Sequence, residues 1–163
     1  MHADIKTNSD PYNAKFSSIL ESISKFNCSD YFSNHISNSQ SEQSIIVKNF
    51  QNNLRTHLAE NHHDINWQTE YKPNVDVKDS IDIFGIHDDF VVVIELDKHR
   101  ADQVSKKFIS RMAIINEHQI HYISLCYPGT QNMNASECVK YFNYCSSIAK
   151  KINAKYAGLI IEK

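Results

Sequence analysis

Three acidic residues, Asp82, Glu95 and Asp97, interrupt stretches that are otherwise apolar. The run from Val91 to Ile94 is apolar at every position, which is typical of a central strand covered on both faces. Side chains alternate along a strand, so Glu95 and Asp97 share one face of it. Half-buried carboxylates need a bound cation or a raised pKa to be tolerated. A hard divalent ion such as Mg²⁺ takes oxygen ligands, and this residue set suits metal-assisted cleavage of a phosphodiester bond.

The position of Asp82 relative to Glu95 follows from the turn between their strands. Two strands, Ser80 to His87 and Phe90 to Asp97, are separated by two residues. If these two residues form a hairpin turn, Asp82 lies directly across from Glu95, with Cβ atoms about 5 Å apart. Like charges in opposite positions destabilise a sheet, which favours a metal site here. The alternative is that Glu95 and Asp97 mark the solvated end of a strand and Asp82 points outward.

The rest of the chain supplies helices and strands that would position this hairpin. Apolar residues at helical spacing predict helices over 13–26, from a cap at Ser41 to about Asn61, from about Arg100 onward, and after a cap at Asn134 or Ser136. Alternating or apolar runs predict further strands over 65–71, 119–127 and 156–161. We interpret the first dozen residues as a loose terminus and 29–40 as a polar loop.

This order of elements predicts an α/β fold with a mixed sheet. Three strands joined by short turns indicate an antiparallel meander, and the later strand–helix–strand steps indicate parallel crossovers. The chain of 163 residues has the size of one compact domain. Within it, we expect 1–40 to form a helical extension and loop, and 41–163 to form the main domain.

Composition limits the possible partners and location. The net charge of −2 excludes a general basic coat for nucleic acid, so any DNA-binding surface must be local. A basic stretch does follow the acids: Lys98, His99, Arg100, Lys106, Lys107 and Arg111. The four cysteines lack C-x-x-C spacing, and no signal peptide or membrane-spanning run is visible. We therefore expect a cytoplasmic protein with free, buried thiols and no membrane partner.

The acidic hairpin resembles a known nuclease motif. Ser-Ile-Asp82-Ile-Phe-Gly85, followed by Val-Val-Val-Ile-Glu95-Leu-Asp97-Lys98, is similar to the motif of the PD-(D/E)xK nuclease superfamily, which has a restriction-endonuclease-like fold. The core of that family is a helix, three strands, a helix and a strand, and the segment from Ser41 to Tyr127, about half the chain, follows this order. The family core would then carry an extra N-terminal helix and a C-terminal helix and strand.

The resemblance implies a function and roles for four residues. Asp82 and Glu95 would bind Mg²⁺ or Mn²⁺, and Asp97 would complete the acidic cluster. Lys98, or a lysine of the following helix, would assist the attacking water. The substrate would be DNA, and the active form a homodimer or part of a larger nuclease complex. A further acid often joins such a site, and Glu42, Glu60 and Glu70 are the candidates in this chain.

One departure from the family motif leaves alternatives open. The usual motif ends in Glu-x-Lys, whereas here Asp97 stands at the lysine position and Lys98 follows one place later. Alternation would put Lys98 on the opposite face of the strand. A catalytically degenerate protein that acts as a binding or regulatory module is therefore the alternative to an active nuclease. A structural subunit that docks through its N-terminal helix is a third possibility.

Overall fold

A computed structural model describes residues 1–73, 79–98, 101–116, 119–129 and 134–162. The strands are β1 (His2–Asn8), β2 (Asn66–Tyr71), β3 (Ile81–Ile86), β4 (Val91–Asp97), β5 (Ile120–Cys126) and β6 (Lys155–Glu162). The helices are α1 (Ala14–Lys25), α2 (Ser29–Phe32), α3 (Gln40–Asn61), α4 (Ala101–Ile114) and α5 (Ala135–Lys151), with a 3₁₀ turn over His35–Ser37.

The strands form one six-stranded mixed sheet in the order β1-β6-β5-β4-β3-β2. The strands β2, β3 and β4 pair antiparallel as a meander, whereas β4, β5 and β6 run parallel through crossovers that contain α4 and α5. Parallel neighbours need such crossovers, because a tight turn cannot return the chain to the end of the sheet where the previous strand began. The predicted α/β class and the mixed sheet are therefore confirmed.

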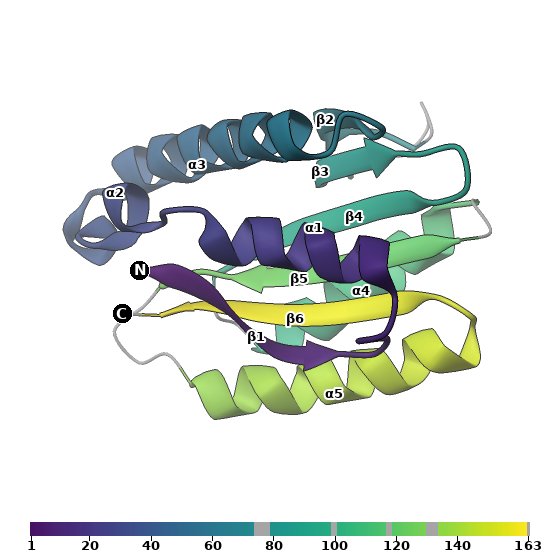
Figure 1. The fold of residues 1–163 in the computed structure, drawn as a ribbon. Helices are drawn as coiled ribbons and strands as arrows, with labels where there is room; N and C mark the ends of the chain where they lie inside the picture. Colours follow the sequence, from purple (N-terminus) through teal and green to yellow (C-terminus); the bar gives the residue numbers. More distant parts are fainter. Residues whose placement is uncertain (74–78, 99–100, 117–118, 130–133, 163) are drawn as a thin grey trace.

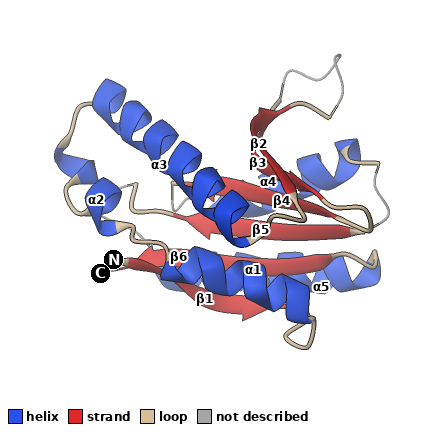
Figure 2. Cartoon of the chain, turned by 45° about the horizontal axis from the view of Figure 1, so that its top comes forward, coloured by secondary structure: helices blue, strands red, loops and turns tan. Residues whose placement is uncertain are grey.

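Helices cover the two faces of the sheet separately (Figures 1 and 2). The helices α1, α2 and α3 pack on one face around buried residues such as Phe16, Phe50 and Leu54. The helices α4 and α5 pack on the other face around Phe108 and Phe142. Because both faces are covered, the central strands β4 and β5 are buried along their whole length. Any polar side chain on β4 is consequently enclosed between the sheet and a helix.

The first strand was missed, and the prediction of a loose N-terminus is wrong. β1 pairs antiparallel with β6, from His2 opposite Glu162 to Asn8 opposite Ala157. Within β1 only Ala3 is fully buried, so the segment lacks the apolar alternation that marks a strand in sequence. Its pairing depends on a partner at the far end of the chain, which local patterns do not reveal.

The predicted helices are confirmed with small changes at their ends. Asn13 caps α1 by accepting a hydrogen bond from the backbone N–H of Phe16. The cap of α3 is Ser39 rather than the predicted Ser41, because Ser39 and Glu42 form a reciprocal capping box. The segment predicted as a plain loop, 29–40, contains the short helix α2 and the 3₁₀ turn.

Two further expectations concern the cysteines and the membrane. All four cysteines are free and buried, as predicted. Among the described residues, no helix is both long and apolar enough to cross a bilayer.

Candidate functional site

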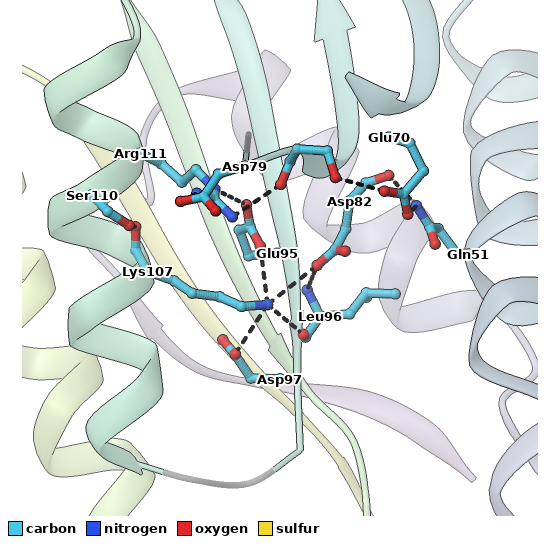
Figure 3. A network of polar contacts seen from close by, with 11 residues as sticks. Gln51, Glu70, Asp79, Asp82, Glu95, Leu96, Asp97, Lys107, Ser110 and Arg111 are labelled. Atoms are coloured by element: carbon cyan, nitrogen blue, oxygen red, sulfur yellow. Dashed lines mark hydrogen bonds and ion pairs between the residues drawn. The ribbon is translucent and has the colours of Figure 1, made fainter. Parts of the chain in front are cut away.

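The three predicted acids meet at the ammonium group of Lys107 on α4 (Figure 3). Lys107 Nζ lies 3.4 Å from Asp82 Oδ2, 3.0 Å from Glu95 Oε2 and 3.3 Å from Asp97 Oδ1. It also donates a hydrogen bond of 2.9 Å to the carbonyl oxygen of Leu96. The carboxylates of two strands and the cation of one helix thus form a single cluster, which we call the acidic cluster.

The predicted hairpin register accounts for this convergence. β3 and β4 pair from Ile86 opposite Val91 to Ile83 opposite Ile94, as predicted for a two-residue turn. The next pair in this register would be Asp82 with Glu95, but the paired residues end at Ile83 and Ile94. There the ladder gives way to a side-chain contact, because Asp82 Oδ2 accepts a hydrogen bond of 2.7 Å from the Leu96 backbone N–H. Asp82 is therefore fixed to the backbone of the strand that carries the other two acids.

Arg111, one helical turn beyond Lys107, holds the other side of Glu95 (Figure 3). Its Nε lies 2.6 Å from Glu95 Oε1, and its Nη1 lies 3.1 Å from Asp79 Oδ2. Its Nη2 donates a hydrogen bond of 2.9 Å to the carbonyl oxygen of Ser80. One guanidinium group thereby ties β4 to the residues that lead into β3. Charge-assisted contacts of this kind are strong and directional.

Burial sets the protonation behaviour of the acids. The exposed fraction is 1% for Glu95 and 3% for Asp97. Burial and the charge of Asp82 raise the pKa of Glu95 to about 8, although Lys107 and Arg111 oppose this shift. Burial also raises the pKa of Asp97, against the opposing effect of Lys107. The site therefore contains carboxyl groups whose ionisation depends strongly on nearby cations.

Lys107 is a permanent cation in this environment. Burial by itself would lower the pKa of its ammonium group, but Asp82, Asp97 and Glu95 together outweigh burial and raise it. The same holds for Arg111, whose pKa is raised by Glu95 and Asp79 in spite of burial. Two fixed positive charges thus face three carboxyl groups.

The acidic cluster has the donor types that a hard divalent cation requires. All three predicted ligands offer oxygen atoms, and Asp97 Oδ2 is buried without a hydrogen-bond partner among the described residues. Within the same residues, no three His, Cys, Asp or Glu side chains are already arranged as a ligand set. The Lys107 ammonium lies between the carboxylates instead. The side chains fit a divalent cation in type and number, and Lys107 would have to make room for it.

A second group of polar residues adjoins Asp82 from α3 and β2. Gln51 Nε2 donates to the Asp82 carbonyl oxygen and, over 3.0 Å, to Glu70 Oε1. Ser80 donates a hydrogen bond of 2.6 Å to Glu70 Oε2. Glu70 has a positive φ of 52°, an uncommon conformation for a residue with a side chain. Of the three candidate additional acids, Glu70 is thus the one placed beside Asp82.

The other predicted residues lie elsewhere. Lys98 is exposed at the end of β4. It lines the same surface pocket as Asp82 and does not belong to the acidic cluster. Glu42 belongs to the capping box of α3, and Glu60 is exposed near its C-terminal end. In the basic stretch, His99 and Arg100 lie outside the described residues.

Comparison with known proteins leaves the family open. No family model matches the chain, and no curated protein matches it.

Proposed function

We propose that this protein is a nuclease that hydrolyses DNA phosphodiester bonds with Mg²⁺ or Mn²⁺. The observation that carries the proposal is the convergence of Asp82, Glu95 and Asp97 on one cationic nitrogen, at 3.0–3.4 Å. Carboxylates that gather around one point can be bridged by a divalent cation. Such sites occur where a phosphoryl group must be bound and attacked by water.

The order of elements supports a restriction-endonuclease-like arrangement. The helix α3, the meander β2-β3-β4, the helix α4 and the strand β5 follow in the order that the PD-(D/E)xK resemblance implies. The acids lie on β3 and β4, where that resemblance requires them. In this proposal, β1, α1, α2, α5 and β6 are additions that complete the sheet and its helical layers.

The proposed roles follow from position and charge. Asp82, Glu95 and Asp97 would hold the metal ion, which when bound would supply Lewis-acid activation of water and of the phosphate. The family motif has a lysine at the position of Asp97. In this chain, Lys107 of α4 would supply that amine instead, and it can orient a water molecule beside the carboxylates. Lys98, which is exposed at the end of β4, would contact the substrate instead. Arg111 keeps Glu95 in place.

A specific observation favours a second candidate, a non-catalytic binding or regulatory module. Lys107 and Arg111 already compensate the acidic cluster, and Glu95 and Asp97 are almost fully buried. Buried ion pairs of this kind also occur as purely structural elements. In that case the cluster would stabilise the hairpin and bind no metal.

Metal titration and DNA cleavage distinguish the two candidates. We expect calorimetry to detect Mn²⁺ or Mg²⁺ binding to the protein, and we expect plasmid DNA to be nicked in the presence of metal. Both signals should be lost in Glu95→Gln and Asp82→Asn, which change charge but little volume. Glu60→Gln, an exposed acid on α3, is the matched control and should retain both. Absence of metal binding, or cleavage that survives both substitutions, would overturn the nuclease proposal.

A further inference from the structure

An open pocket lies beside Asp82, on the face of the sheet covered by α3. It has a volume of about 290 Å³ and is bounded by α3, β2, β3 and the residues that follow β4 and β5. The side chains that matter for its chemistry are Lys48, Gln51, Glu70, Asp82, Lys98 and Tyr127. The pocket therefore has one wall in common with the acidic cluster, namely Asp82.

The acids of this pocket have partners inside the protein. Glu70 accepts hydrogen bonds from Gln51 and Ser80. Asp82 accepts from the Leu96 backbone and faces Lys107 at 3.4 Å. Lys107 compensates the charge of Asp82, whereas Glu70 is stabilised by two neutral donors and interacts electrostatically with Lys48.

The two lysines of the pocket are in a different situation. Lys48 on α3 and Lys98 after β4 are both exposed. Among the described residues, neither ammonium group has a hydrogen-bond or ion-pair partner. The pocket thus presents two exposed lysines that no described acid holds by an ion pair or a hydrogen bond, and such lysines can contact a phosphate directly.

Two residues that line the pocket are buried and held by contacts with the rest of the protein. Tyr127 is 4% exposed and stacks on Phe32 with ring centroids 5.1 Å apart. Gln51, 4% exposed, is held by its contacts with Glu70 and Asp82. A binding site with fixed walls loses little entropy when a ligand enters.

We infer that this pocket binds a backbone phosphate of a DNA strand next to the bond presented to the acidic cluster, with Lys48 and Lys98 as the phosphate contacts. The inference rests on the proposed nuclease function, because it describes how a DNA strand would lie beside the acidic cluster. Phosphate contacts from lysines position nucleic acid without reading its sequence. The pocket is small for a ligand site, which suits one nucleotide unit of a longer strand.

Anisotropy of a fluorescein-labelled oligonucleotide of about 12 nucleotides tests the inference. Binding is measured in EDTA, so that neither metal nor cleavage is required, with the single strand and its duplex as separate arms. For Lys48→Ala combined with Lys98→Ala, we expect affinity to fall about tenfold or more, and the slope of log affinity against log salt to decrease by about 1 to 2. The stronger-binding arm identifies the form of DNA that the pocket prefers.

Matched variants separate this site from general charge effects. Lys150→Ala combined with Lys151→Ala removes the same charge from exposed positions of α5, on the other face of the sheet, and should leave affinity and slope unchanged. Lys48→Arg combined with Lys98→Arg should retain binding. Equal losses in the α5 variant, unchanged binding in the Lys48/Lys98 variant, or no DNA binding by the unsubstituted protein would each overturn the inference.

Glu95→Gln distinguishes failure of the pocket from failure of the nuclease proposal. This variant removes a proposed metal ligand and leaves the pocket intact, so it should bind DNA with the same dependence on Lys48 and Lys98. If the unsubstituted protein binds DNA in this way but shows no metal binding or cleavage, the pocket stands and the nuclease proposal fails. If metal-dependent cleavage occurs without any contribution from the two lysines, the nuclease proposal stands and the inference about the pocket fails.

Discussion

The side chain of Asp82 accepts a hydrogen bond of 2.7 Å from the backbone N–H of Leu96, at the point where the ladder between β3 and β4 ends. A carboxylate thus takes the place of a backbone carbonyl as the acceptor for the adjacent strand. The same residue also faces Lys107 at 3.4 Å and borders the pocket on the α3 side. Asp82 therefore connects the stability of the hairpin to the chemistry proposed for the site.

Substitutions at Asp82 should separate these two roles. Asp82→Ala removes the acceptor and leaves the Leu96 N–H without it, which should cost roughly 1–3 kcal/mol in the free energy of unfolding. Asp82→Asn keeps an acceptor oxygen and should cost clearly less. Urea unfolding of both variants at neutral pH provides the measurement. Equal destabilisation by Ala and Asn would show that the charge, and not the hydrogen bond, holds the hairpin end.

Removal of the central cation should be more damaging. In Lys107→Met, the carboxyl groups of Glu95 and Asp97 stay buried without the ammonium group, and we expect a loss of about 3 kcal/mol or more in unfolding free energy. Lys106→Met, an exposed neighbour on α4, should change stability by no more than about 0.5 kcal/mol. Chemical denaturation of the two variants checks this difference. A loss in Lys107→Met no greater than in Lys106→Met would mean that the acidic cluster does not need its cation.

The raised pKa of Glu95 predicts a pH dependence of stability. The pKa is about 8 in the folded protein against an ordinary value of 4.5 for a glutamate, so the folded state holds the proton more tightly than the unfolded state. The resulting contribution to stability is fully present at a pH below the pKa of the unfolded state, and it is lost as the pH rises through the pKa of the folded state. Between these values the loss should be roughly 1 kcal/mol per pH unit.

Comparison with Glu95→Gln isolates this contribution. The variant cannot titrate at this position, so the unsubstituted protein should lose stability relative to it as the pH rises, with the difference levelling off above the folded pKa. Unfolding free energies are measured across this range in EDTA, so that no divalent cation alters the titration. Parallel pH profiles for the two proteins would contradict a shifted Glu95.

The packing of α5 on β6 gives a prediction away from the site. A Cβ atom added at Gly158 would lie 2.2 Å from Cγ of Phe142, so the helix contacts the strand where a side chain is absent. Gly158→Ala should therefore destabilise the protein by about 1–3 kcal/mol through overpacking. Combination with Phe142→Leu should recover part of this loss, because the two changes act on the same contact. Additive losses in a thermodynamic cycle would contradict the proposed contact.

Local signals were sufficient for the hairpin and most helices. A two-residue turn fixes the register of β3 and β4, so the approach of Asp82 to the strand that carries Glu95 follows from chain spacing. β1 was missed because its pairing with β6 is remote in sequence and buries little of its surface. A polar edge strand carries no periodic signal that sequence could show.

The partners of the acids were harder to predict than the acids themselves. In the sequence, Lys107 and Arg111 belong to a general basic stretch, although each follows a buried residue of α4, Val104 or Phe108, by three positions. That spacing places them on or beside the inner face of the helix, which was the available signal. Which carboxylates they would meet depends on how α4 lies against β4, and helix placement on a sheet is set by tertiary packing.

The pairing of β1 with β6 has a consequence for how the chain acquires its shape during synthesis. His2 lies opposite Glu162, so β1, which emerges from the ribosome before the other strands of this sheet, gains its neighbour only when β6 has also emerged. Until then, β1 can pack against α1 but has no strand to pair with. The meander β2-β3-β4 and the helix α4 can already assemble at that stage. We therefore expect the hairpin that carries the acids to form early, and the edge of the sheet to close as a late step.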